Sequence, residues 1–127
     1  MADLDDVRAF ASNLPGAIEG ADRFAFSVPV KGKPKGFLWT WAERIDPKKA
    51  RVINEKVIAV VVPNLHAKDL LIASDPVVYF TEDHYNGFSA VLVRLEAISL
   101  NELKEIVIEA WKCKAPKDLL AAYVEDE

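Results

Sequence analysis

The sequence has 127 residues, of which 51% are hydrophobic and 28% are charged. This composition excludes an intrinsically disordered chain, which combines few apolar residues with a high net charge. The length is typical of one domain, so we expect a single α+β domain over residues 1–127. The only cysteine is Cys113, which excludes an internal disulfide and a metal site built from two or four thiolates. We expect no metal and no other cofactor.

The N-terminal segment and the apolar runs argue against export and against a membrane location. The first six residues, Met-Ala-Asp-Leu-Asp-Asp, lack the basic and then apolar pattern of a secretory signal. The longest apolar run, residues 57–62, is far shorter than the roughly 18 residues that a bilayer requires. We therefore expect a cytoplasmic protein that does not associate with membranes.

The charges are distributed unevenly along the chain. The whole sequence has 16 basic and 20 acidic residues, which give a net charge of −4. Residues 31–56 contain eight basic and three acidic residues, a net charge of +5, so the rest of the chain carries −9. This asymmetry predicts one positive surface on an acidic body.

The first half of the chain predicts one helix and three strands. Apolar residues recur at helical spacing over residues 4–14, where Asp3 can cap the helix and Pro15 ends it. Residues 23–28 and 37–42 have the two-residue period of strands and flank a basic loop that contains Gly and Pro, so they predict an antiparallel hairpin. A second basic loop, residues 43–55, leads to a β-branched strand at 57–62 that should be buried on both faces or be central in its sheet.

The second half predicts a short helix, two strands and two further helices. Asn64 can cap a helix over residues 65–73, and Asn86-Gly87 is typical of a tight turn between strands at 77–80 and 88–95. Ser99 and Glu102 form the pattern of a capping box before a long amphipathic helix, and Pro116 begins a short final helix. Since hairpin-length loops join most neighbouring strands, we expect a mainly antiparallel sheet with helices packed on one side.

Several segments together resemble the MmcQ/YjbR family over residues 7–121. The most specific is residues 78–87, Val-Tyr-Phe-Thr-Glu-Asp-His-Tyr-Asn-Gly, and others are Leu-Pro-Gly-Ala at 14–17 and Phe-Leu-Trp-Thr-Trp at 37–41. The resemblance implies a CyaY-like, frataxin-like fold with a double-wing architecture and a DNA-binding function. It implies no catalytic residues, and the first helix lacks the dense acidic face of iron-binding frataxins.

The two basic loops supply the candidate nucleic-acid contacts. Ammonium groups neutralise phosphates and release counterions, and guanidinium groups bind phosphate through two parallel hydrogen bonds. If both loops leave one edge of the sheet, they form a two-pronged surface for weak, mostly non-specific binding of DNA. The alternative is that these are simply solvated loops. The candidate residues are Lys31, Lys33, Lys35, Arg44, Lys48, Lys49 and Arg51.

A candidate pocket for a small acidic ligand lies near His84, Tyr85 and Arg94. A histidine beside carboxylates can act as a general base or metal ligand, but the spacing is not that of a metal site, and the alternative is a turn in which the ring bonds to the backbone. We expect Arg94 to pair with Glu82 or Glu96. A third possibility is a protein-interaction domain that uses the acidic body as its contact surface.

Three further residues have two possible roles. Trp39 and Trp41 can stack on bases if they are exposed, or can belong to the core. Cys113 lies between two lysines that can lower its pKa, but without a partner group it is more simply a structural thiol. The sequence contains no phosphate-binding, hydrolase or metalloprotease motif, so we expect a protein that is not an enzyme.

Overall fold

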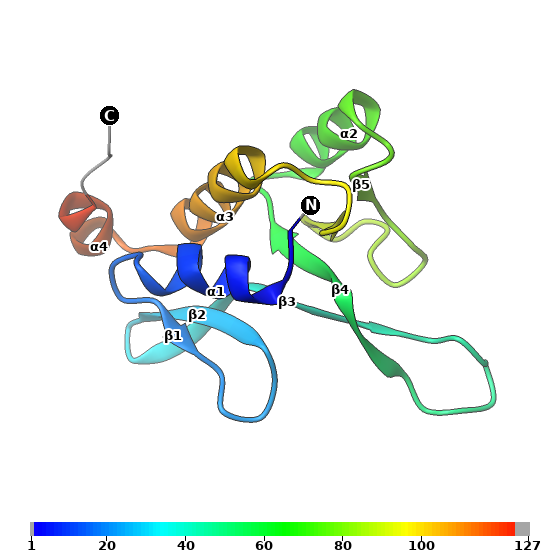
Figure 1. The fold of residues 1–127 in the computed structure, drawn as a ribbon. Helices are drawn as coiled ribbons and strands as arrows, with labels where there is room; N and C mark the ends of the chain where they lie inside the picture. The colour runs from blue at the N-terminus through cyan, green and yellow to red at the C-terminus, as the bar shows by residue number, and fades with distance from the viewer. Residues whose placement is uncertain (1, 124–127) are drawn as a thin grey trace.

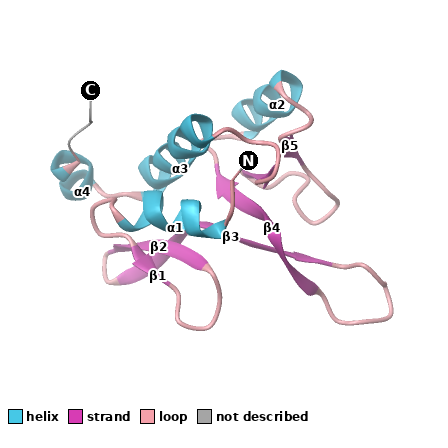
Figure 2. Cartoon of the chain, in the orientation of Figure 1, coloured by secondary structure: helices cyan, strands magenta, loops and turns pink. Residues whose placement is uncertain are grey.

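The computed structural model describes residues 2–123 as an antiparallel sheet with helices on one side (Figures 1 and 2). The strands lie in the order β1-β2-β3-β4-β6-β5, and each neighbouring pair is antiparallel. The α+β fold class predicted from the sequence is therefore confirmed. The elements are α1 (Leu4–Ser12), β1 (Ile18–Glu19), β2 (Ala25–Val30), β3 (Lys33–Glu43), β4 (Val52–Val61), α2 (Leu65–Ser74), β5 (Tyr79–Phe80), β6 (Ala90–Arg94), α3 (Leu100–Lys114) and α4 (Lys117–Ala122).

The main core lies between the sheet and the helices α1 and α3. One face of α3 is buried because its apolar residues recur every three to four positions, and Trp111 near its end is completely inaccessible to solvent. The Trp111 Nε1 atom donates a hydrogen bond of 2.9 Å to the carbonyl of Pro15, which ties α3 to the turn after α1. None of the helices in residues 2–123 combines the length and the apolarity needed to cross a bilayer.

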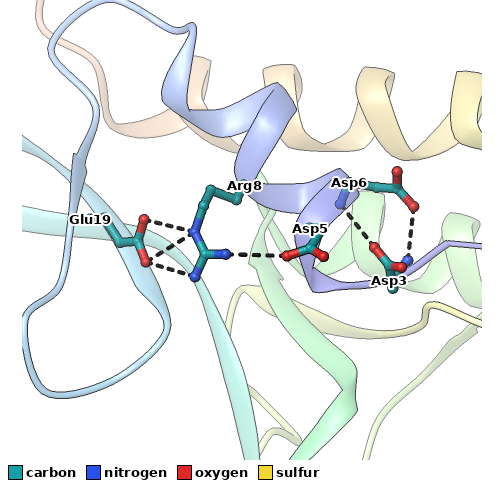
Figure 3. A network of polar contacts seen from close by, with 5 residues as sticks. All are labelled: Asp3, Asp5, Asp6, Arg8 and Glu19. Carbon is teal, nitrogen blue, oxygen red and sulfur yellow. Dashed lines mark hydrogen bonds and ion pairs between the residues drawn. The ribbon is translucent and has the colours of Figure 1, made fainter.

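The helix caps follow the sequence with one difference. Asp3 and Asp6 form a reciprocal capping box at the start of α1, and Figure 3 shows this box beside Arg8, which bonds Glu19 of β1 at 3.0 Å. At α3, Ser99 accepts the backbone N–H of Glu102, as predicted. The Glu102 carboxylate, however, accepts a hydrogen bond from the hydroxyl of the buried Tyr79.

The β2–β3 hairpin is longer and tighter than the sequence indicates. Only Lys31 and Gly32 form the turn, with φ angles of 54° and 81°, the left-handed pair that matches the twist of a two-residue hairpin. Pro29 and Pro34 are partners across the ladder. Every second pair in an antiparallel ladder exchanges no hydrogen bonds, so two prolines that face each other next to the turn leave the hairpin intact. The expected loop is thus mostly strand.

A second, smaller cluster covers the sheet face that points away from the helices. Val57, Ala59 and Leu92 are buried there under partly buried aromatic residues, Trp39, Trp41, Phe80 and Tyr85. The strand at 57–62 is therefore buried on both faces, as predicted. Part of this aromatic cover comes from the long connection between β5 and β6. The connection is wider than the tight turn that the sequence predicts, because a two-residue turn of that type needs two positive φ angles and only Gly87 has one here.

Candidate nucleic-acid interface

The two basic loops lie at opposite ends of β3 (Figure 1). The β2–β3 turn precedes Lys33, whereas the β3–β4 loop follows Glu43. At about 3.3 Å per residue, a strand of this length separates its two ends by roughly 30 Å. The expectation of one two-pronged surface is therefore wrong. The physical reason is topological: when three strands run as successive hairpins, the two connections of the middle strand must leave it at opposite ends.

The hairpin end presents its three lysines without internal partners. Lys31 occupies the turn, and Lys33 and Lys35 follow it on β3, opposite Val30 and Val28. All three residues are exposed, and none forms an ion pair with another residue in the part of the chain that the structure describes. The pairing of β2 with β3 fixes the backbone of Lys33 and Lys35, and all three lysine side chains are exposed to solvent.

The β3–β4 loop uses its two arginines to hold its own backbone. Arg44 donates to the carbonyls of Pro47 and Lys49 at 3.3 and 3.0 Å. Arg51 donates at 2.8 Å to the carbonyl of Ala42. The other two predicted contacts in this loop are Lys48 and Lys49. Their side chains form no described hydrogen bond or ion pair within residues 2–123.

Arg51 also contacts His84. A residue of the predicted nucleic-acid site therefore lies against a residue of the predicted acidic-ligand pocket. The Arg51 Nη2 atom lies 2.6 Å from His84 Nε2. Because a guanidinium has only donors, this imidazole nitrogen must act as the acceptor. The other ring nitrogen lies 3.9 Å from the Glu82 carboxylate, which also accepts the His84 backbone N–H at 3.0 Å. The histidine thus joins two loops.

The three residues of the predicted acidic-ligand pocket do not converge. Tyr85 accepts a hydrogen bond of 3.0 Å from Trp39 Nε1, whereas Arg94 lies 3.9 Å above the Phe80 ring. Arg94 also donates to the carbonyls of Pro76 and Val77, so it pairs with neither of the expected acids. Glu96 pairs with Lys56 at 2.9 Å instead. Arg94 lines a hollow of about 370 Å³ with Trp41 and Phe80, but His84 and Tyr85 do not.

A hollow beside the start of β3 brings in residues that the sequence reading missed. It has a volume of about 630 Å³, and its lining includes Gly36 of β3 together with Lys112 and Lys114 of α3. The C-terminal end of α3 therefore lies beside the start of β3. We call Lys31, Lys33, Lys35, Lys112 and Lys114 the hairpin-end surface. Lysines in the last turn of a helix are favoured by the helix dipole, which is the only signal the sequence carries for the last two.

Lys68 is a second missed residue, and it is buried within α2 with 3% of its surface exposed. Its ammonium group donates to the carbonyl of Tyr85 and, at 3.0 Å, to that of Phe88. Burial lowers the pKa of Lys68, and the nearby Asp69 partly opposes this effect. Lys68 thus fixes the long β5–β6 connection onto α2. Leu70, on the same helix, is exposed.

Cys113 also lines the 630 Å³ hollow. Burial raises the pKa of its thiol, Glu109 adds to this effect, and Lys114 opposes it. The possibility that the two flanking lysines lower the pKa is therefore wrong, because desolvation outweighs the attraction of one ammonium group. Within residues 2–123, no three metal-ligating side chains gather into a group that could hold an ion.

Comparison with known proteins identifies the fold and a set of relatives. The chain is similar to the crystal structure of Deinococcus radiodurans protein DR2400, a DUF419 domain, with a TM-score of 0.65 and 19% identity over 87% of this chain and 77% of that one. No known family model matches the sequence. The uncharacterized proteins Rv2570 of Mycobacterium tuberculosis and Mb2600 of Mycobacterium bovis are each 32% identical to it over 98% of this chain and 97% of their own. The chain therefore belongs to the family of these mycobacterial proteins and has the fold of the DUF419 domain.

Proposed function

We propose that this protein is a non-enzymatic member of the MmcQ/YjbR family that binds nucleic acid in the cytoplasm. The family assignment is supported by the segments at 14–17, 37–41 and 78–87 and by the similarity of the fold to the DUF419 domain of DR2400. A DNA-binding function is what the family resemblance implies. The structure adds a reason to place the contacts at one end of the sheet.

The observation that carries this proposal is that Lys31, Lys33 and Lys35 lie at the start of β3 or just before it, while Lys112 and Lys114 of α3 line a hollow that also includes Gly36 of β3. Lys31, Lys33, Lys35 and Lys114 make no ion pair within residues 2–123, and Lys112 has only a distant pair with Glu109 at 3.9 Å. Four of these five ammonium groups therefore have no described ion-pair partner within residues 2–123 that would compete with an approaching phosphate, whereas Lys112 would have to give up its pair with Glu109. They can therefore release counterions from a phosphate backbone.

The β3–β4 loop is the weaker candidate, because its two arginines bind backbone carbonyls. Arg44 and Arg51 already satisfy backbone carbonyls, and the acidic side chain of Glu82 lies beside His84, which Arg51 contacts. A phosphate there would compete with these bonds and would meet a carboxylate. We therefore move the proposed interface away from this loop.

The proposed binding is weak and depends on salt. The whole chain has a net charge of −4, so long-range repulsion from the acidic body opposes the local attraction. On duplex DNA, each neutralised phosphate contributes about −0.9 to the slope of log K against log salt. Five lysines would give a slope of at most about −4 to −5. Within residues 2–123, no helix carries a row of Arg, Asn and Gln side chains suited to base edges, so binding should depend little on sequence.

The test measures fluorescence anisotropy of labelled duplex and single-stranded DNA at about 50 and 200 mM salt. We expect micromolar binding in low salt that weakens steeply in high salt. The double variant Lys33→Glu/Lys35→Glu should bind at least tenfold more weakly and should have a salt slope that is smaller by about 2.

The matched control is Lys48→Glu/Lys49→Glu, which makes the same change in net charge at the other end of β3. We expect it to retain most of the binding. Absence of binding by the natural chain in low salt would refute the proposal. An equal loss in both variants, or a loss only in the control, would show that the hairpin-end surface is not the interface.

A further inference from the structure

An exposed aromatic residue lies in the same hollow as the α3 lysines. Phe88 is 48% exposed, and within residues 2–123 it is the one aromatic residue among the exposed large apolar side chains. It lines the 630 Å³ hollow together with Trp39, Ser89, Lys112 and Lys114. One hollow is therefore lined by an exposed ring and by two lysines, a combination of residue types that can stack a base and contact a nucleic-acid backbone.

Phe88 is held in place by two other rings. Its ring is stacked on Trp39 with centroids 6.3 Å apart and an interplanar angle of 24°, and on Tyr85 at 6.0 Å and 18°. Trp39 and Tyr85 are joined to each other by a hydrogen bond of 3.0 Å. The Phe88 ring is therefore nearly parallel to each of its two neighbours, which are linked to each other, so its plane is set by this packing.

The backbone that carries this ring is fixed as well. Lys68 donates to the carbonyls of both Tyr85 and Phe88, and Ala90, two residues after Phe88, begins β6, which is paired with β4 on one side and β5 on the other. The position of Phe88 relative to β3 and to the end of α3 is thus set by the fold. Gly36 has no side chain to fill the hollow next to Trp39, whose ring is 3.7 Å from where a Cβ would lie.

We propose that this hollow takes an unpaired nucleotide, so that the protein prefers single-stranded nucleic acid to duplex. A base would stack on Phe88, while Lys112 and Lys114 contact the neighbouring phosphates and the hairpin lysines continue the track. Aromatic stacking requires a free base face, which a duplex does not offer. Glu109 also lines the hollow, but Lys112 lies 3.9 Å from its carboxylate and partly neutralises it. This inference rests on the proposed function.

The experiment compares binding of single-stranded and duplex DNA by Phe88→Ala, Phe88→Leu and Phe88→Tyr. Because stacking contributes about 1–3 kcal/mol per base, Phe88→Ala should weaken binding of the single strand by about 5- to 100-fold. Phe88→Leu keeps apolar volume but has no flat ring, so it should lose affinity as well. Phe88→Tyr keeps the ring and should bind within about twofold of the natural chain.

Two controls keep the outcomes separate. Ile45→Ala removes an apolar side chain that is 71% exposed at the other end of β3, and it should change neither affinity. Far-ultraviolet circular dichroism should show that all variants are folded. If neither form of DNA binds, the proposed function fails. If DNA binds but Phe88→Ala and Phe88→Leu match the natural chain, or duplex binds more tightly than single strand, this inference alone is overturned.

Discussion

Gly16 illustrates how a single backbone position sets the packing between the first turn and the last helix. Its φ is +72°, and a Cβ placed there would lie 2.5 Å from Leu119 Cδ1. Alanine would therefore meet an unfavourable backbone conformation and would also displace the end of the Leu119 side chain of α4. We expect Gly16→Ala to lower the free energy of unfolding by about 1–3 kcal/mol, as measured by urea denaturation. Gly32→Ala is the control, because Gly32 has a φ of +81° with no atom within 4 Å. An equal or larger loss for Gly32→Ala would contradict the role of Leu119.

Tyr79 makes stability depend on alkaline pH. Burial is the main cause that raises the pKa of its hydroxyl above the usual 10, and the hydrogen bond to Glu102 adds to it. The folded state therefore keeps this proton at a pH where the unfolded state loses it. The stabilising contribution is complete below about pH 10 and is lost as the pH rises further. We expect the free energy of unfolding to fall more steeply above about pH 10 in the natural chain than in Tyr79→Phe. Parallel curves for the two proteins would show that Tyr79 is not responsible.

Lys68 connects two elements that the sequence does not link. Its ammonium group bonds two backbone carbonyls of the β5–β6 connection, and hydrogen bonds to charged groups contribute about 1.5–3 kcal/mol each. The cost of burying the charge offsets part of this gain. We expect Lys68→Met to lower the free energy of unfolding by about 1–3 kcal/mol. Lys104→Met, at an exposed position of α3, should change it by less than about 0.5 kcal/mol. A neutral Lys68→Met would mean that the two carbonyls find other partners.

Local sequence patterns predicted where most elements lie, and they failed where a partner strand decides the outcome. The capped helix over Leu4–Ser12 was predicted because both its cap and its apolar spacing are local. The 31–36 segment was predicted as a loop because it holds two glycines and a proline, whereas the structure extends β3 to Lys33. Proline is tolerated in a ladder only where its nitrogen is not needed, and that depends on which residue lies opposite.

For the whole molecule, the fold class could be predicted and the arrangement of the charges could not. Periodicity and short connections are sufficient to indicate an antiparallel sheet with helices on one side, which the structure confirms. The relative positions of the two basic loops depend on the strand that separates them. That strand, β3, places Lys33 and Arg44 at opposite ends of the sheet. The proximity of Lys112 and Lys114 to the start of β3 joins positions about 80 residues apart, and no local pattern reports such a contact.

The two-residue turn at Lys31 and Gly32 has a consequence for affinity. A lysine in a long flexible loop must give up many backbone conformations when a ligand orders it, and this entropy loss weakens binding. Lys33 and Lys35 belong to a paired strand, so their backbone is already ordered before any encounter. Only side-chain rotamers remain to be restricted. The hairpin is therefore preorganised, and even a few modest contacts there can give a measurable complex.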